Sequence, residues 1–485
     1  MLLNALCAEG AFFMNSNKMS TSLSENMKYL GNKLSVDTNF DIVYRVIKVG
    51  GRNACIYFID GFCKDELMQK MLQYFMDIKE EEMPKDAHEM SKTSMPYVEV
   101  DLQDEWEKIT YFIMSGVFAL FIDGYDKCIL IDSRTYPARN VSEPEKDKVL
   151  RGSKDGFVET IVFNTALIRR RIRSTELRME MLHAGNSSKT DIVLCYMESR
   201  VDHAFLTQIK ERIKQIEVDA LTMNQESLAE CLYKKRWYNP FPKFKFTERP
   251  DTAAAQILEG DIVILVDNSP SAMITPTSIF DVVEEADDYY FPPITGTYLR
   301  LSRFIIAILT YFVTPTFLLL MQQPEWIPAG FEFIQVKDTQ NVPLIWQFLI
   351  LELALDGLRL AAVNTPNMLS TPLSVMAALV LGEFSVNSGW FNSEVMLYMA
   401  FVAIANYTQA SYELSYAIKF MRIINLILTA MFGIWGYIAG VALLILAIVT
   451  NKTVSGKSYI YPLFPLNLKQ LSKRFLRYRL PGARE

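Results

Sequence analysis

The sequence predicts an α/β cytoplasmic domain made of two related subdomains, followed by an all-α multi-pass transmembrane domain. The charge supports this division, because residues 1–300 hold 36 Lys+Arg and 46 Asp+Glu, whereas residues 301–485 hold 13 and 9. Short apolar runs alternate with helical patterns in the first part, and long uncharged stretches occupy the second. A chain of 485 residues is too long for one ordinary core. We therefore expect two or three domains.

The N-terminal residues and the cysteines indicate a reducing compartment for the first part. Residues 1–38 are rich in Asn, Ser, Lys and Met without a sustained period, which predicts a flexible N-terminal arm. The chain begins without a positively charged segment, so no secretory signal is expected. The six cysteines are scattered and form no CxxC pair, which favours free thiols. The soluble part is expected to be cytoplasmic.

Residues 39–150 are predicted to form the first α/β subdomain. A strand at 56–59 precedes a helix with apolar residues at helical spacing from 67 to 75. The runs 116–122 and 128–132 flank an acidic turn that contains glycine. Such a pair of runs is typical of a β-hairpin.

The same pattern returns in residues 186–299, the second predicted subdomain. A strand at 191–198 precedes a helix over 205–216, and a further strand follows at 261–267. Two independent α/β units would produce much the same pattern. The sequence therefore leaves open whether the subdomains arose by duplication.

A linking helix with a basic run is expected between the subdomains, within residues 151–185. Positive charge on its C-terminal half would suit phosphate, lipid headgroups or an acidic partner subunit. A solvated face that complements the helix dipole is the alternative. The acidic character of the domain disfavours nucleic acid. The predicted partner or subunit contact consists of Arg169, Arg170, Arg171 and Arg173.

The transmembrane domain is expected over residues 300–450, followed by a basic cytoplasmic tail at 451–485. An 18-residue helix is about 27 Å long, which nearly spans a hydrocarbon core. Arg300 and Arg303 precede the first uncharged stretch and place the soluble domain inside. The tail holds eight basic residues against one acid and should lie beside anionic lipid. The predicted spans are 304–321, 344–363, 395–410 and 423–449, with a short or re-entrant segment at 370–384.

The second predicted span carries three charges on one face. Glu352, Asp356 and Arg359 fall at i, i+4 and i+7, and each charge at mid-membrane costs about 2.5–3.5 kcal/mol. Asp356 and Arg359 can neutralise each other, which leaves Glu352 unmatched. The group is expected to form either an ion path or a structural polar contact between helices.

Further polar residues mark the other membrane segments. Ser374 and Glu383 lie in the short 370–384 segment, which would line a pore if it is re-entrant or belong to an ordinary span if it is longer. Asn406 and Gln409 lie one turn apart and suit interhelical hydrogen bonds or an ion path. Gly436 and Gly440 form a GxxxG motif, which favours close helix packing.

No motif indicates catalysis, a cofactor or a metal. The chain has no P-loop, no dinucleotide fingerprint and no G-x-S-x-G. None of its three histidines is paired with Cys or Glu at metal-ligand spacing. An enzyme is therefore not expected.

Several longer motifs resemble the signature stretches of a known family, the A subunits of the GerA-type spore germination receptors. The order and spacing of the motifs match over residues 38–468, and Asn268 departs from the Gly or Thr that is common there. We expect that departure to change the turn geometry only. The matching stretches are Arg151–Glu159, Ala166–Arg173, Ser188–Thr190, Glu248–Asp251, Val266–Pro270, Pro372–Glu383, Ser411-Tyr412 and Tyr461-Pro462.

The resemblance implies a multi-pass protein of the inner spore membrane that forms a homo-oligomer, a pentamer by analogy, around a cation-conducting pore. Its partners would be other spore germination membrane proteins. The implied function is an ion channel that promotes or amplifies the release of ions and dipicolinate during germination. A non-conducting scaffold or receptor subunit is the alternative. A transporter ranks lower, because transporters carry broken helices in both halves and only one broken segment is evident here.

Overall fold

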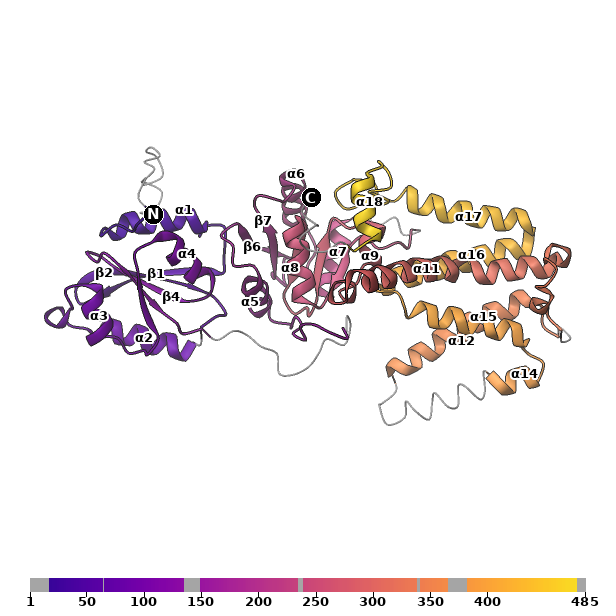
Figure 1. The fold of residues 1–485 in the computed structure, drawn as a ribbon, viewed down its shortest axis with the longest axis horizontal. Coiled ribbons are helices and arrows are strands. Elements are labelled where there is room, and N and C mark those ends of the chain that lie inside the picture. The colour runs from indigo at the N-terminus through magenta and orange to yellow at the C-terminus, as the bar shows by residue number, and fades with distance from the viewer. Residues whose placement is uncertain are drawn as a thin grey trace. The chain divides into compact units, whose positions relative to one another are not determined.

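The computed structural model describes residues 17–63, 65–134, 149–233, 239–337, 341–364 and 382–477. The chain divides into two compact units (Figure 1). The first unit contains strands and helices, and the second is mainly helical. The first consists of residues 1–146, 153–232 and 247–274, and the second of residues 147–152, 233–246 and 275–485.

The first sheet has five strands in the order β1-β2-β4-β5-β3. The long hairpin of β1 and β2 and the predicted hairpin of β4 and β5 are both antiparallel. The strands are β1 Ile42–Val49, β2 Arg52–Ile59, β3 Val100–Gln103, β4 Phe118–Ile122 and β5 Cys128–Ile131, and the helices are α1 Leu23–Leu34, α2 Asp65–Asp77, η1 Glu80–Glu82, α3 Ala87–Thr93 and α4 Trp106–Met114.

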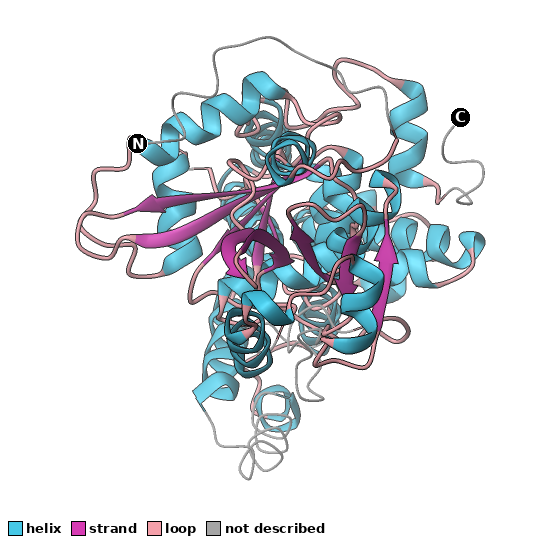
Figure 2. Ribbon diagram, turned by 90° about the vertical axis from the view of Figure 1, so that its left-hand side faces the viewer, coloured by secondary structure: helices cyan, strands magenta, loops and turns pink. Residues whose placement is uncertain are grey.

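Helices cover both faces of this sheet (Figure 2). Along the central strand β4, Phe118, Leu120 and Ile122 pack in one core with α2 and α3. The intervening Ala119 and Phe121 pack in a second core with α1 and α4. Successive side chains of a strand point to opposite faces, so β4 reads as an uninterrupted apolar run. The sequence made this strand recognisable for that reason.

The second sheet has the strand order β6-β7-β9-β10-β8, which repeats the topology of the first sheet strand for strand. The two subdomains are therefore related in fold, as predicted. The strands are β6 Leu177–Ala184, β7 Thr190–Met197, β8 Lys245–Thr247, β9 Ile262–Val266 and β10 Ala272–Thr275, and the helices are α5 Ile161–Arg171, α6 His203–Lys214, α7 Asn224–Leu232 and α8 Pro250–Glu259.

The repetition extends to individual side chains at the first helix of each subdomain. Asn26, in the first turn of α1, accepts from the amide of Ser20 and donates to its carbonyl, at 2.9 and 2.6 Å. Asn164, at the same place in α5, makes the same pair of bonds to Val158, at 2.8 and 2.5 Å. Both asparagines are buried. The same pair of local hydrogen bonds in both subdomains supports their descent from one ancestral unit.

An aspartate from the equivalent β-turn caps each of these helices. Asp123 accepts from the amide of Leu23 at 2.9 Å, and Asp267 accepts from the amide of Ile161 at 3.3 Å. An oxygen that accepts from a free N–H of the first helical turn stabilises the helix start. The turn between the last two central strands therefore anchors the first helix of its own subdomain.

Two predicted boundaries of the soluble part are wrong. Residues 23–34 are not a flexible arm, because α1 buries Leu23, Leu30 and Leu34 in the core of the first sheet. The linking helix predicted over 151–185 is shorter, and the strand β6 follows it. Since α5 and β6 correspond to α1 and β1, the second subdomain begins before residue 186.

The described cysteines are free thiols, as the sequence predicted. Cys55, Cys128 and Cys195 lie inside the two sheets. Burial raises the pKa of the Cys55 thiol to about 12. These side chains therefore serve as small apolar core residues.

The second unit is mainly helical. Its helix α11 has 30 residues and begins at Pro293, with Pro292 as the N-cap, and proline is tolerated at a helix start. The helices are α9 Ile279–Val283, α10 Asp287–Tyr290, α11 Pro293–Gln322, η2 Pro324–Trp326, η3 Glu332–Ile334, α12 Leu344–Asn364, α14 Ser385–Asn387, α15 Ser393–Asn406, α16 Tyr412–Phe432, α17 Ile434–Val449 and α18 Leu468–Phe475.

Two predicted spans differ from these helices. The stretch 423–449 is not one helix, because Gly433 adopts a φ of 58° between α16 and α17 and ends the first of them. α16 in turn begins at Tyr412, so it includes charged residues before position 423. The span predicted at 395–410 ends earlier, at Asn406. Of the predicted segment 370–384, residues 370–381 lie outside the described part of the chain.

Two of the described helices, α11 and α16, are long and apolar enough to cross a membrane. α15 and α17 are apolar but shorter. The other long helix, α12, has 21 residues and contains the three charges predicted from the sequence.

Candidate functional site

A cluster of four charged side chains joins α12 to α16. Glu352 of α12 is 3% exposed and accepts from Arg422 of α16, whose Nε and Nη2 lie 3.0 and 2.5 Å from Oε1. Lys419, one turn earlier on α16, lies 3.3 Å from Oε2 of the same carboxylate. Asp356 lies 2.5 Å from Lys419 Nζ. Two acids and two bases therefore balance inside the bundle.

Backbone carbonyls satisfy the remaining donors of the cluster. Arg422 Nη1 donates to the carbonyl of Thr310 on α11 at 3.1 Å. Lys419 Nζ donates to the carbonyl of Glu352 at 3.2 Å. A buried ion pair is tolerated only when its other polar atoms also find partners. We call Glu352, Asp356, Lys419 and Arg422 the charge cluster.

The predicted pairing within α12 is wrong. Arg359 does not neutralise Asp356, because its guanidinium lies over the rings of Tyr407 and Tyr416, 5.1 and 5.0 Å from their centroids. Glu352 is not unmatched, since it has two cationic partners. The bases of α16 compete better for the carboxylates because α12 and α16 pack side by side, whereas Arg359 lies nearer two aromatic rings that attract a cation.

The other predicted polar residues occupy different surroundings. Asn406 and Gln409 are buried, and their side-chain oxygens have no hydrogen-bond donor in the described part of the chain. The carbonyl of Asn406 accepts from Ser415 Oγ at 3.2 Å. Glu383 is exposed. Ser374 lies outside the described residues.

The outer face of α12 is apolar and exposed in the described part of the chain. Its exposed side chains recur every three or four residues along one side of the helix, and a Cβ at Gly357 would meet no atom within 4 Å. Asp356 borders this face and keeps 34% of its side chain exposed. We call the following residues the outer stripe: Trp346, Ile350, Leu353, Gly357 and Leu360.

The GxxxG motif packs α17 closely against α16. Gly436 and Gly440 are the buried residues of α17, and most of its other large side chains are exposed. A Cβ at Gly436 would lie 1.8 Å from the carbonyl oxygen of Leu428. A Cβ at Gly440 would lie 2.2 Å from Asn425 Oδ1. The two helices therefore approach each other closely at these glycines.

A second ion network lies at the start of α11. Arg300 Nη2 is 2.7 Å from Glu284 Oε1, and its Nε is 3.2 Å from Asp288 Oδ2. Arg303 pairs with Glu285 at 2.7 Å and also with Asp288. Asp288, Glu284 and both arginines are buried. The two arginines that the positive-inside rule places at the membrane surface are thus held by acids just before the helix.

Electrostatics keep Glu284 ionised despite its burial. Burial alone would raise the pKa of this carboxyl, but Arg300, Lys245 and Arg474 together hold the pKa below its usual range. A depressed carboxyl pKa contributes stability at neutral pH that is lost as the pH falls through the folded-state value. The network is therefore intact at neutral pH.

The predicted basic contact on α5 is divided between the interior and the surface. Arg169 is fully buried, and its Nε and Nη2 donate to both carboxylate oxygens of Asp41 at 2.8 and 3.0 Å. Arg171 pairs with Asp155 at 2.6 Å. Arg170 and Arg173 are exposed. Arg169 therefore joins the two subdomains, since Asp41 precedes β1 and Arg169 belongs to α5.

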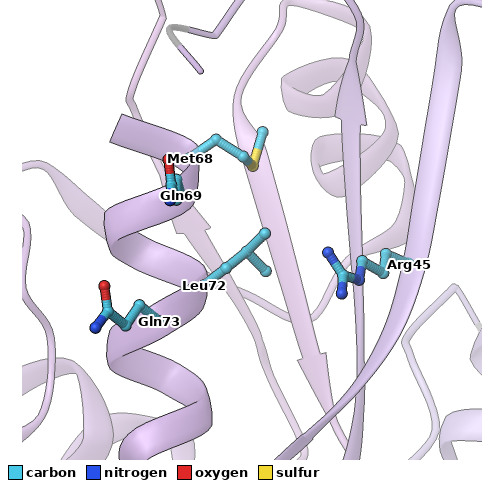
Figure 3. Close-up of a pocket in the computed structure, with 5 residues that line it drawn as sticks. All are labelled: Arg45, Met68, Gln69, Leu72 and Gln73. Carbon is cyan, nitrogen blue, oxygen red and sulfur yellow. The ribbon is translucent and has the colours of Figure 1, made fainter. Parts of the chain in front are cut away.

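A shallow hollow of about 540 Å³ lies between α2 and β1 of the first subdomain. Figure 3 shows Leu72 of α2 and Arg45 of β1 pointing toward each other across it. Met68, Gln69 and Gln73 complete the lining. The described residues contain no group of His, Cys, Asp or Glu that could hold a metal ion.

The model of the Bacillus/Clostridium GerA spore germination protein family matches residues 28–485 of this chain. The chain belongs to the GerA family. Stage V sporulation protein AF of Bacillus subtilis is 36% identical over 462 residues, covering 95% of this chain and 93% of that protein. The uncharacterized membrane protein YfkQ of Bacillus subtilis is 28% identical over 466 residues, covering 95% and 89%.

One solved structure is also similar, the N-terminal domain of the A subunit of the Bacillus megaterium spore germinant receptor GerK3. It shares 27% identity, covers 53% of this chain and 96% of that one, and gives a TM-score of 0.41. Membership of the GerA family makes this chain a membrane protein of spore germination, and GerA-family proteins are receptor subunits rather than enzymes.

Sequence reasoning missed the two bases of this GerA-family protein's charge cluster, Lys419 and Arg422. Both lie before position 423, where the last span was expected to begin. A signal was present: Ser411 accepts from the amide of Leu414 as a helix cap, and apolar residues continue between it and the uncharged run. Extending the helix back to that cap would have included both bases in the last predicted span.

Proposed function

We propose that this protein acts as an oligomeric ion channel of the spore germination apparatus, a homo-oligomer whose conduction path runs between copies. The charge cluster supports this most directly. Because each copy neutralises Glu352, Asp356, Lys419 and Arg422 internally, opening a path through a single bundle would break the three ion pairs among them. A path between copies leaves them intact.

The outer stripe is the surface we propose to face the neighbouring copy. An apolar helix face with a central glycine suits close packing of membrane helices. Asp356 borders that face and is partly exposed, so copies arranged around an axis would carry a ring of carboxylates near it. Such rings favour cations. We propose that Asp356 and Glu383 line the ion path. Glu352, Asn406 and Gln409, which are buried, would hold the helices that carry the path in position.

Conductance of the purified protein in planar bilayers tests this proposal. Wild type should conduct cations, and Asp356→Asn should reduce the preference for cations over anions, with Glu383→Gln measured beside it. Glu352→Gln is the matched comparison on the same helix. It should lower the yield of folded protein, because it weakens the partner of buried Arg422. A verified oligomer that stays silent, alone and with other spore germination membrane proteins, would sink the channel proposal.

A non-conducting scaffold or receptor subunit is the second candidate. Phe163 of α5 is 45% exposed, and the exposed Arg170 and Arg173 follow seven and ten residues later in the chain. An aromatic side chain beside arginines is typical of protein interfaces. Replacing Phe163 and Arg173 together by Ala should abolish partner capture under this hypothesis and leave conductance unchanged under the first.

We also propose the inner spore membrane as the location, with the soluble domain and the tail on the cytoplasmic side. The bases at the start of α11 and after α17 support this orientation. A protease added to sealed vesicles of known orientation should then cleave the soluble domain and the tail from the same side.

A further inference from the structure

A run of large apolar side chains is exposed just before α18 and in its first turn. Residues 463–470 are all exposed, and Phe464, Leu466 and Leu468 keep 69%, 63% and 70% of their surface accessible. Side chains of this kind are normally covered, and a contiguous exposed set marks an interaction site. This chain's described residues leave the run uncovered.

The structure fixes the depth of this run relative to the membrane helices of its own unit. The ring of Phe475 in α18 packs on Phe304, with centroids 5.0 Å apart. Arg300 Nη1 donates to the carbonyls of Lys473 and Arg474 at 3.0 and 3.2 Å. Phe304 begins the uncharged part of α11. α18 therefore lies at the level where α11 passes from charged to apolar sequence.

The polar side of α18 is basic. Lys469 is exposed, and Lys473 and Arg474 follow on the same short helix. Nearby acids are engaged, since Arg474 pairs with Asp281 and Glu284. Apolar side chains beside lysines at the hydrocarbon boundary are the pattern of an interfacial helix, in which lysine stems extend toward the headgroups.

We propose that residues 461–477 form a membrane-interface anchor, with the apolar run inserted at the headgroup–acyl boundary of an anionic leaflet and Lys469 against lipid phosphates. The lysines favour anionic lipid over a second copy, because a symmetric contact between two such surfaces would bring like charges together. Through Arg300 and Phe475 the anchor would hold the start of α11 at the membrane surface. This inference is independent of ion conduction.

Photocrosslinking of the full chain tests the anchor. A benzophenone amino acid replaces Phe464 in protein reconstituted into vesicles of phosphatidylcholine, with or without phosphatidylglycerol. Mass spectrometry then identifies the crosslinked molecule and measures the adduct yield. Leu446, which is 57% exposed on α17, provides the lipid-facing control, and Val98, which is 96% exposed in the first subdomain, provides the aqueous control.

We expect a lipid adduct at position 464 comparable to that at 446, and an increase with phosphatidylglycerol that Lys469→Glu reduces by about fivefold. Lys48→Glu, an exposed lysine on β1, should leave the yield unchanged. An adduct to a second copy of the chain, or a yield no higher than at 98, would overturn the proposal. Equal yields with and without phosphatidylglycerol would overturn its dependence on anionic lipid.

Discussion

At the scale of single residues, the pair Arg169–Asp41 shows how burial changes the meaning of a charge. Both side chains are at most 1% exposed, and the bidentate contact joins two subdomains. The backbone adds to this junction, because Phe40 donates to the carbonyl of Met179 at 3.2 Å. Removing one member of a buried pair leaves the other charge desolvated, which usually costs more than the pair contributes.

We therefore expect Arg169→Met to lower the free energy of unfolding of the soluble unit by about 3–5 kcal/mol. Arg173→Met, an exposed arginine two residues after the same helix, should change it by no more than about 0.5 kcal/mol. Thermal unfolding of the detergent-solubilised protein measures both. The double variant Asp41→Leu with Arg169→Met should recover much of the loss. Equal effects of the two arginine variants would contradict this assignment.

The basic run also shows where sequence reasoning ends. Four arginines between 169 and 173 predicted one basic surface, yet only Arg170 and Arg173 are exposed. Arg169 finds its partner 128 residues earlier in the chain. No local pattern reveals such a pair, because helical spacing places Arg169 on a face without saying what covers that face.

At the scale of elements, the hairpin of α16 and α17 depends on two glycines that differ in their surroundings. The atom that a Cβ at Gly436 would meet is a backbone carbonyl, which cannot move without disturbing α16, whereas the atom near Gly440 belongs to the side chain of Asn425. Another rotamer of Asn425 would move its Oδ1 and Cγ, which leaves only its Cβ, 2.9 Å from the added atom, in place. The two positions should therefore differ in tolerance.

Gly436→Ala should destabilise the folded protein more than Gly440→Ala, with a cost at Gly436 of at least about 1–3 kcal/mol from overpacking. Gly357→Ala should leave the stability of a single copy unchanged, because a Cβ there meets nothing within 4 Å among the described residues. The melting temperature and the monodisperse fraction after detergent extraction report all three. A reversed order of the first two variants would show that α16 and α17 pack less closely than the structure indicates.

Helices and strands could be predicted where hydrophobic spacing within the element was clear, and they were missed where that spacing was weak or misleading. The uninterrupted apolar strand β4 and the helix α2 followed from spacing alone. β6 was overlooked although Leu177, Met179 and Met181 alternate with charged residues. The turn at Gly433 lies within 27 uncharged residues, and hydropathy does not distinguish one long helix from two packed ones.

At the scale of the whole molecule, the repeated soluble fold could be predicted from the sequence, whereas the assembly surface of the helical bundle could not. The repetition of strand order explains why the two subdomains could be predicted as related from weak periodicity. The described helices of the bundle show no comparable internal repeat. Its charge cluster is satisfied within one copy, so the outer stripe left for assembly is apolar. Hydropathy alone cannot separate a face that meets lipid from one that meets a neighbouring copy.

The outer stripe provides that distinction experimentally. Gly357→Leu adds bulk at the centre of the stripe, where a Cβ meets no described atom of its own chain within 4 Å. If copies pack there, the oligomer should dissociate while the melting temperature of the separated copy stays the same, because close helix contacts in membranes depend on small residues. Native mass spectrometry in detergent measures the assembly. Leu443→Ala, on the exposed side of α17, is the matched control and should leave it intact. An oligomer that survives Gly357→Leu with unchanged mass would exclude the stripe as the contact, and the proposed conduction path would then have to lie along another helix face.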